Sequence, residues 1–143
     1  MSAATVTVHA SCIAVDGRGI LLSGRSGSGK SDLALRLIDR GASLVSDDYT
    51  ILNADGDRLF ASAPANIAGM IEVRGLGIVE RPCVETAAIC LFVDLDGPVD
   101  RMPGEGAMVT LAGIDIPAAT LNALEASAPI KVEVALDLLG LTR

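Results

Sequence analysis

Polar and apolar residues alternate over residues 5–9 and then give way to short apolar runs. The alternation predicts a half-buried strand, with its valines on the apolar face and His9 on the polar face. The next two runs, residues 11–15 and 19–23, are typical of strands, and Asp16-Gly17 between them is typical of a two-residue hairpin turn. The beginning of the chain therefore predicts three consecutive strands.

A helix is predicted over residues 30–40, where leucine, alanine and isoleucine recur every three to four positions. Gly41 stands where helices commonly end in a left-handed residue. Residues 43–46 form an apolar run that predicts a strand, and Asp47-Asp48 follows it directly. Because ligands bind at the carboxyl ends of strands in open α/β sheets, we expect both carboxylates to lie beside the loop that precedes the helix.

The rest of the chain predicts mainly strands and hairpins. Two closely spaced glycines interrupt an apolar segment at residues 71–79 and predict an irregular, closely approached backbone there. A last helix is predicted at residues 129–139, because Pro129 suits a first helical turn and Gly140 the position after the end. The remaining predictions are strands at 49–53 and 58–63 around the turn Asp55-Gly56, a short turn or helix ending at Met70, a strand at 87–94, a flexible acidic loop at 96–106, and paired strands at 107–111 and 114–116 around Ala112-Gly113. Together they predict an α/β fold, a mixed sheet with helices and β-hairpins, in a single domain over residues 1–143.

One motif carries specific chemistry. The stretch Gly24-Arg25-Ser26-Gly27-Ser28-Gly29-Lys30-Ser31 matches the phosphate-loop pattern G-x-x-x-x-G-K-[ST] at every specified position, between a predicted strand and a predicted helix. Glycines let successive backbone N–H groups converge on a polyphosphate without an intervening Cβ atom. Lys30 is expected to reach the β- and γ-phosphates and Ser31 to bind Mg²⁺. The alternative is a glycine-rich turn that only caps a helix, and a dinucleotide fold is disfavoured because the third glycine of its pattern is absent.

Composition limits the partners that we expect. The formal net charge is −7, with one Tyr, two Phe and no Trp, so nucleic acid is not an expected partner, because its backbone is held by many Lys and Arg residues. No apolar stretch approaches the roughly 18 residues of a membrane span and no basic-then-apolar leader opens the sequence, so we expect a cytoplasmic protein without a membrane partner. Cys12, Cys83 and Cys90 form no C-x-x-C pair and are expected to be buried free thiols.

Asp47 and Asp48 are the first candidates for catalysis, because a carboxylate beside a bound nucleotide can accept the proton of an attacking hydroxyl group. The alternative for this pair is a solvated turn at the end of a strand. From the residue pattern alone, His9 is a surface histidine, and Glu72 with Arg74 is an exposed charge pair of an edge strand. Arg74 is also a candidate phosphate contact.

Taken in order, these residues resemble the catalytic domain of HPr kinase/phosphorylase, a family that phosphorylates a serine of the phosphocarrier protein HPr. The resemblance rests on S-G-S-G-K-S-D-L-A-L-R-L-I-D-R-G, the paired aspartates and E-V-R-G-L-G, and it covers about residues 9–79. It implies a P-loop kinase domain of the HPr kinase/phosphorylase (PEP carboxykinase-like) type, with ATP and Mg²⁺ as cofactors and an HPr-like phosphocarrier as partner. It also implies a set of roles: His9 as an active-site histidine, Lys30 as the phosphate-loop lysine, Asp48 as the proton acceptor, Asp47 as its support, and Ser31 and Glu72 as magnesium ligands.

Several features depart from the family pattern. Asp32 stands where the family usually has glutamate, and residues 116–120 (I-P-A-A-T) correspond to a family loop whose arginine is absent here. Full-length members also carry an N-terminal domain and a helix beyond the position of Arg143, so we expect a short form in which reverse phosphorolysis is weak or absent. A serine kinase acting on HPr, a nucleotide-binding regulatory module and a small-molecule kinase all stay open, since the loop does not specify its acceptor. A homo-oligomer stays open as well.

Overall fold

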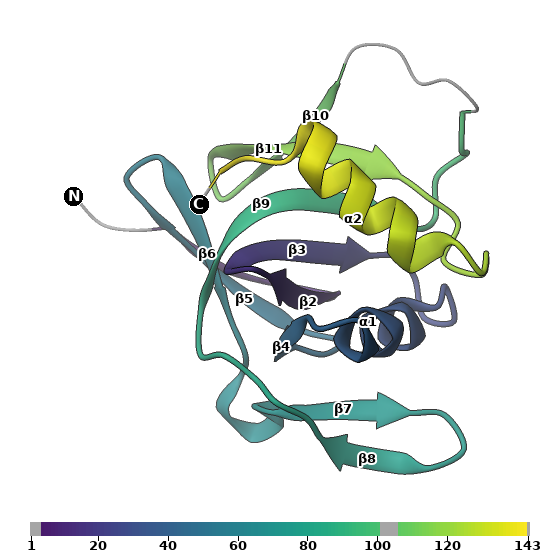
Figure 1. The fold of residues 1–143 in the computed structure, drawn as a ribbon. Helices are drawn as coiled ribbons and strands as arrows, with labels where there is room; N and C mark the ends of the chain where they lie inside the picture. The colour runs from purple at the N-terminus through teal and green to yellow at the C-terminus, as the bar shows by residue number, and fades with distance from the viewer. Residues whose placement is uncertain (1–3, 101–105, 143) are drawn as a thin grey trace.

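The computed structural model describes residues 4–100 and 106–142, which form a curled sheet with two helices on one face (Figure 1). The elements are β1 (Thr5–Val8), β2 (Ala10–Val15), β3 (Arg18–Ser23), α1 (Lys30–Asp39), β4 (Ser43–Ser46), β5 (Thr50–Asp55), β6 (Arg58–Ser62), the short 3₁₀ helix η1 (Ala65–Ile67), β7 (Met70–Val73), β8 (Gly77–Glu80), β9 (Ala87–Asp94), β10 (Ala107–Leu111), β11 (Ile114–Thr120) and α2 (Ala128–Leu139). The predicted mixed α/β fold is confirmed. The loop predicted at 96–106 falls in part on residues 101–105, which lie outside the described residues.

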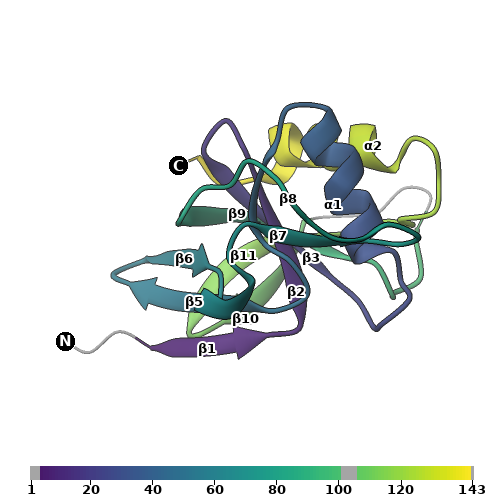
Figure 2. The same ribbon diagram turned by 90° about the horizontal axis from the view of Figure 1, so that it is seen from below.

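Nine of the described strands form one sheet, in the order β1-β5-β6-β9-β3-β2-β4, with β11 also pairing to β9 and β10 to β11. β3 runs parallel to β9 and antiparallel to β2. The first residues of β9 pair with β6 and its last residues pair with β11. Between these two ends the strand is curved (Figure 1). β7 and β8 form a separate two-stranded hairpin next to α1 (Figure 2).

The two faces of the sheet bury two separate apolar clusters. Along β3, Ile20 and Leu22 belong to the cluster under the helices, while Leu21 between them belongs to the opposite cluster, and all three are fully buried. This is the period of two expected for a strand that is covered on both faces. Leu33 and Leu37 of α1 complete the helical side, as their spacing predicts. β3 therefore lies at the centre of the fold, and it ends at the phosphate loop.

Glycines define both ends of α1. Gly29, before the first turn, and Gly41, after the last, have φ angles of 97° and 111°. Ala42 N–H donates to Leu37 O at 3.0 Å, which satisfies a carbonyl group at the end of the helix. The predicted C-terminal end of α1 is thus confirmed, and α2 begins one residue before its predicted start.

Residues 71–79 lie in a regular hairpin, so the prediction of an irregular, closely approached backbone there is wrong. β7 and β8 pair in register from Met70 opposite Glu80 to Val73 opposite Gly77. Gly75 and Gly77 have φ angles of 90° and 103°, and a Cβ atom added at either would meet open space. Glycine is therefore needed at these positions because the backbone has a positive φ there. It is not needed to make room for a neighbouring segment.

Smaller differences occur at other strands. β1 is less buried than its alternation predicts, because Val6 is 38% exposed and only Val8 packs against the core. β11 continues past the predicted end at residue 116, because residues 118–120 pair with β9. The turn after β5 is at residues 56–57, one position later than predicted, since Asp55 still pairs with Arg58.

Two of the three cysteines are buried as predicted, and the third is not. Cys12 and Cys90 are buried free thiols, and burial raises the pKa of both, so they stay neutral. Cys83 is exposed. It lies in the connection between β8 and β9, where its backbone pairs with Leu44. In the part of the chain that is described, no helix is long and apolar enough to cross a membrane.

Candidate functional site

The predicted phosphate loop joins the end of β3 to the start of α1, and its glycines allow its tight course. Gly27 and Gly29 have φ angles of 87° and 97°, which residues with side chains rarely adopt. Gly24 lies so close to Ser28 that an added Cβ atom would be 2.9 Å from the serine Cβ. Ser28 N–H donates to Arg25 O at 3.0 Å and closes the loop on itself.

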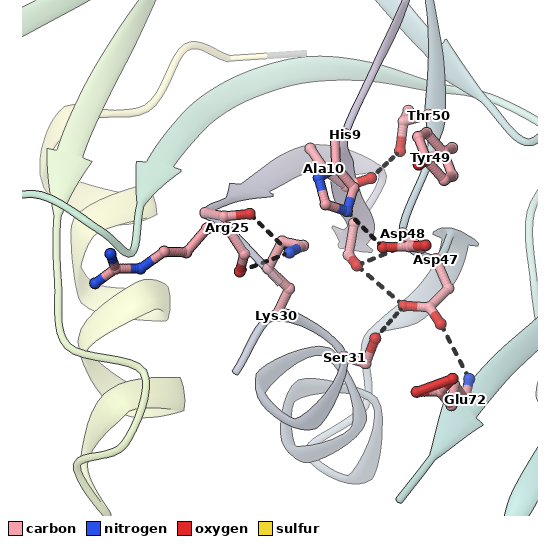
Figure 3. Close-up of polar contacts among 12 residues, drawn as sticks. His9, Ala10, Arg25, Lys30, Ser31, Asp47, Asp48, Tyr49, Thr50 and Glu72 are labelled. Atoms are coloured by element: carbon pink, nitrogen blue, oxygen red, sulfur yellow. Dashed lines mark hydrogen bonds and ion pairs between the residues drawn. The ribbon is translucent and has the colours of Figure 1, made fainter. Parts of the chain in front are cut away.

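Lys30 lies inside this loop, with only 5% of the residue exposed. Its ammonium group donates to Gly24 O at 2.7 Å and to Arg25 O at 3.1 Å (Figure 3). A buried ammonium group needs such acceptors, because it has lost its water. The loop therefore holds one positive charge at its centre, the place where a phosphate-loop lysine contacts polyphosphate in proteins that carry this motif.

The end of β9 fixes the start of the loop. Leu95 N–H donates to Ser23 O at 2.8 Å, and Asp96 accepts the backbone N–H of Arg25 at 2.6 Å. The Arg25 side chain is 83% exposed, lies 3.4 Å from the same carboxylate, and points away from Asp47 and Asp48 in Figure 3. The sequence identified Arg25 as part of the loop but gave no sign that Asp96 would hold it.

Asp47 is a buried junction between three elements. One carboxylate oxygen accepts the hydroxyl groups of Ser11, from β2, at 3.0 Å and of Ser31, from α1, at 2.6 Å. The other oxygen accepts the backbone N–H of Glu72, from β7, at 3.0 Å. The residue is only 6% exposed. Asp47 therefore ties the phosphate-loop helix to the hairpin and to the centre of the sheet.

Asp48 differs from Asp47 in exposure, in backbone conformation and in the partner of its carboxylate. Its side chain is 54% exposed, and its backbone has a φ of 67°, a left-handed conformation that is uncommon outside glycine but that Asp adopts more often than most residues. Its carboxylate lies 2.8 Å from His9 Nε2, which is the donor when the carboxylate is ionised. Tyr49 stacks on the His9 ring, with 5.0 Å between ring centroids and 27° between planes. The exposed aspartate is thus paired with a histidine that an aromatic ring supports (Figure 3).

A cleft of about 940 Å³ collects most of the predicted site residues. Its lining includes Ser26, Gly27, Gly29, Lys30, Ser31, Asp47, Asp48, Glu72 and Arg74. Gly24, Arg25, Ser28 and His9 are not among its lining residues; the first three belong to the loop behind it, and His9 touches it through Asp48. Sequence reasoning missed Ser11, Tyr49 and Asp96, because a buried serine, a tyrosine and a loop aspartate carry no motif of their own.

The segment between β11 and α2 closes the cleft near the phosphate loop. Arg36 of α1 donates to the carbonyl oxygens of Ala123 and Glu125 and holds this segment in place. Leu124 lines the cleft, and a Cβ atom added at Gly29 would be 3.1 Å from Ala123 Cβ. Residues 116–120, matched above to an arginine-containing family loop, lie in strand β11, and the segment that follows contains no arginine either.

The donor groups at the centre of the cleft suit magnesium and a polyphosphate. Ser31 and Asp47 present hydroxyl and carboxylate oxygens, which are the ligands that Mg²⁺ prefers. Behind the cleft lining, Ser28 Oγ is buried in the loop and has no hydrogen-bond partner among the described residues, although buried hydroxyl groups normally have one. In the described residues, no cluster of three or more His, Cys, Asp or Glu side chains is arranged to hold a metal. The fit therefore rests on the loop and on Asp47.

Comparison with known proteins identifies the family. Residues 1–136 match the family model described as the HPr serine kinase C-terminal domain. This chain belongs to that family. The match extends well beyond residues 9–79, which carried the resemblance in the sequence, and includes both helices almost completely.

Individual relatives of the family agree with this assignment. The chain is 36% identical over 132 residues to the HPr kinase/phosphorylase of Geobacillus thermodenitrificans, covering 83% of this chain and 43% of that protein. It is 37% identical over 123 residues to the protein of the same name from Chlorobaculum tepidum, covering 76% of this chain and 36% of that one. A solved HPr(Ser) kinase/phosphatase from Coxiella burnetii has a TM-score of 0.80 at 27% identity, over 92% of this chain and 94% of that chain. The chain thus spans about two fifths of these curated relatives.

Proposed function

We propose that this chain is a cytoplasmic serine kinase that uses ATP and Mg²⁺ to phosphorylate HPr, or a closely related phosphocarrier, in regulation of the phosphotransferase system. The proposal rests on one observation: Lys30, Ser31 and Asp48 line the same cleft, and buried Asp47 also lines it and accepts a hydrogen bond from Ser31. Family membership supports the choice of acceptor, because relatives carry HPr in their names.

Each residue has a defined task in this proposal. Bound Mg-ATP supplies the phosphoryl group and a metal charge that offsets its oxygens. Lys30 would exchange its bonds to the loop carbonyls for the β- and γ-phosphates, and Ser31 and Glu72 would hold the metal through their hydroxyl and carboxylate oxygens. Asp48 accepts the proton of the acceptor serine, for which an exposed carboxylate at the cleft is suited. His9 orients that carboxylate, and Arg74 contacts phosphate from the hairpin.

The decisive experiment combines the protein with Mg-ATP and HPr and follows the intact mass of HPr. We expect one added phosphoryl group, and no addition with Asp48→Asn in the same time. Nucleotide binding without transfer to HPr would favour the regulatory module. Consumption of ATP with a small-molecule acceptor alone would favour a small-molecule kinase.

We further propose that reverse phosphorolysis is weak. The reverse reaction places inorganic phosphate beside a seryl phosphate, and two adjacent anions need arginine or backbone donors between them. Among the described residues that line the cleft, Arg74 is the one arginine, and Arg25 points elsewhere. Phosphorylated HPr with Mg²⁺ and millimolar phosphate should therefore release pyrophosphate much more slowly than the forward reaction proceeds. Comparable rates in both directions would show that the arginine-containing loop of the family is dispensable.

A further inference from the structure

Ser11 joins the two aspartates of the site through one hydroxyl group. The residue lies on β2 and is fully buried. Its Oγ donates to Asp47 Oδ1 at 3.0 Å and accepts the backbone N–H of Asp48 at 3.1 Å. One side chain therefore contacts the carboxylate of the buried aspartate and the backbone of the exposed one.

The second of these bonds holds Asp48 in its unusual conformation. A φ of 67° is uncommon at a residue with a Cβ atom, and although Asp adopts it more readily than most, the surroundings must favour it. The turn supplies further restraints, because Tyr49 N–H donates to Asp47 O at 2.7 Å and the Ser46 hydroxyl donates to Tyr49 O. The bond to Ser11 acts directly on the Asp48 backbone, and in this conformation the Asp48 carboxylate lies beside His9 (Figure 3).

Among the described residues, the Ser11 hydroxyl group makes no other hydrogen bond. The other residues of β2 are apolar, and a hydroxyl buried among them is unfavourable unless it is hydrogen-bonded. Both bonds that Ser11 makes in the described residues go to the aspartate pair. A serine that only filled space in this strand could be replaced by alanine without consequence for the site.

We propose that Ser11 is a positioning residue for phosphoryl transfer, which sets the backbone of Asp48 so that its carboxylate faces the acceptor while Asp47 stays fixed on Ser31. The inference rests on the proposed kinase function. It assigns to Ser11 no contact with the nucleotide or the acceptor, and its effect passes through Asp48.

The kinetic test compares Ser11→Ala with Thr50→Val. Thr50 is an equally buried hydroxyl residue whose Oγ1 donates to Ala10 O at 2.8 Å and forms a hydrogen bond with neither aspartate. Ser11→Ala should lower kcat for transfer to HPr about 10- to 100-fold, since small misplacements of a reacting group have effects of this size. The affinity for Mg-ATP should stay within about threefold, and Thr50→Val should change kcat by less than about twofold.

A double mutant separates positioning from general loss of structure. If Ser11 acts through Asp48, adding Ser11→Ala to Asp48→Asn should lower kcat no further than Asp48→Asn alone. Multiplication of the two single effects would overturn the proposal, and so would an unchanged kcat in Ser11→Ala. Should Ser11→Ala be too unstable to purify, Ser11→Cys keeps a similar volume with a weakly bonding thiol and should change kcat in the same direction.

A measurement without catalysis keeps this inference distinct from the kinase proposal. Hydrogen exchange of the Asp48 amide should be at least about tenfold faster in Ser11→Ala than in the wild type, and unchanged in Thr50→Val, because only the first loses the acceptor of that N–H. If the wild type transfers nothing to HPr, the kinase proposal fails, and the exchange result still decides whether Ser11 holds Asp48. Equal exchange rates in Ser11→Ala and the wild type would overturn the role of Ser11.

Discussion

The two walls of the cleft are held in place by different kinds of contact. One wall is formed by the phosphate loop, the first turn of α1 and Asp47, and its polar groups are buried and hydrogen-bonded. The other wall is the β7–β8 hairpin, which carries Glu72 and Arg74 as exposed residues. Buried polar groups keep one geometry, because water does not replace a bond that is broken. We therefore expect the first wall to determine the chemistry and the hairpin to adjust to what is bound.

The largest effect should come from the two aspartates. Asp48→Asn should lower the transfer rate about 10²- to 10⁴-fold, the range for loss of a general base, with little change in stability. Asp47→Asn should lower the rate less but destabilise the fold by about 1–3 kcal/mol, because its buried oxygens accept bonds from three other residues. Single-turnover rates and thermal unfolding measure both. The opposite ranking of the two rates would assign the base to Asp47.

A pair of isoleucines tests how the hairpin is anchored. Ile71 is 1% exposed and packs in the cluster under the helices, whereas Ile78 on the neighbouring strand is 62% exposed. Ile71→Ala should destabilise the protein by about 2–5 kcal/mol, the usual range for a buried isoleucine, and Ile78→Ala by less than about 0.5 kcal/mol. Denaturant unfolding distinguishes them. Similar losses would mean that the hairpin is not held by its buried residue.

Lys30→Ala tests the charge at the centre of the loop. A hydrogen bond to a charged group contributes about 1.5–3 kcal/mol, so the Kd for Mg-ATP should rise about 10- to 100-fold, with a slower transfer and an intact fold. Lys131→Ala is the control, since Lys131 does not line the cleft and forms a surface ion pair with Glu125 at 2.7 Å. Calorimetric titration gives both affinities. If neither affinity nor rate changes in Lys30→Ala, the loop assignment is refuted.

The smallest effect is expected from Arg74 on the hairpin. Arg74→Ala should lower kcat/KM for HPr only about two- to fivefold, because exposed charge contacts contribute up to about 1 kcal/mol. Arg81→Ala, just after β8 and outside the cleft lining, should leave kcat/KM unchanged. A loss above about 100-fold in Arg74→Ala would show that the hairpin holds the reacting phosphate as firmly as the loop does.

Local patterns were sufficient for the parts of the fold that depend on neighbouring residues. The phosphate loop, the end of α1 at Gly41 and the turns at Asp16-Gly17 and Ala112-Gly113 follow from residue types at fixed spacing. The hairpin at residues 71–79 was missed because its two glycines were assigned to close packing, whereas the turn requires their positive φ.

The parts of the site that depend on distant residues were not visible in the sequence. Ser11 appears in the sequence as one residue of an apolar strand, and its partners are 36 and 37 positions away. The positive φ of Asp48 likewise depends on a turn that the rest of the sheet holds in place. Asp96 holds the phosphate loop from 71 positions away. Such contacts depend on which strands are neighbours in the sheet. The sequence indicated this order only through its resemblance to a family.

The place of β9 in the sheet has a consequence for how the protein is made. During synthesis the ribosome releases β2, β3 and α1 before β9, so the edge of β3 that pairs with β9 has no partner until residues 87–94 have emerged. Leu95 and Asp96, which fix the start of the phosphate loop, emerge at the same stage. A nascent chain that ends before residue 87 carries the complete nucleotide motif next to a strand with an unpaired edge. Unpaired strand edges bind chaperones and promote aggregation. The motif therefore gains its final shape only after residues 87–96 have been translated.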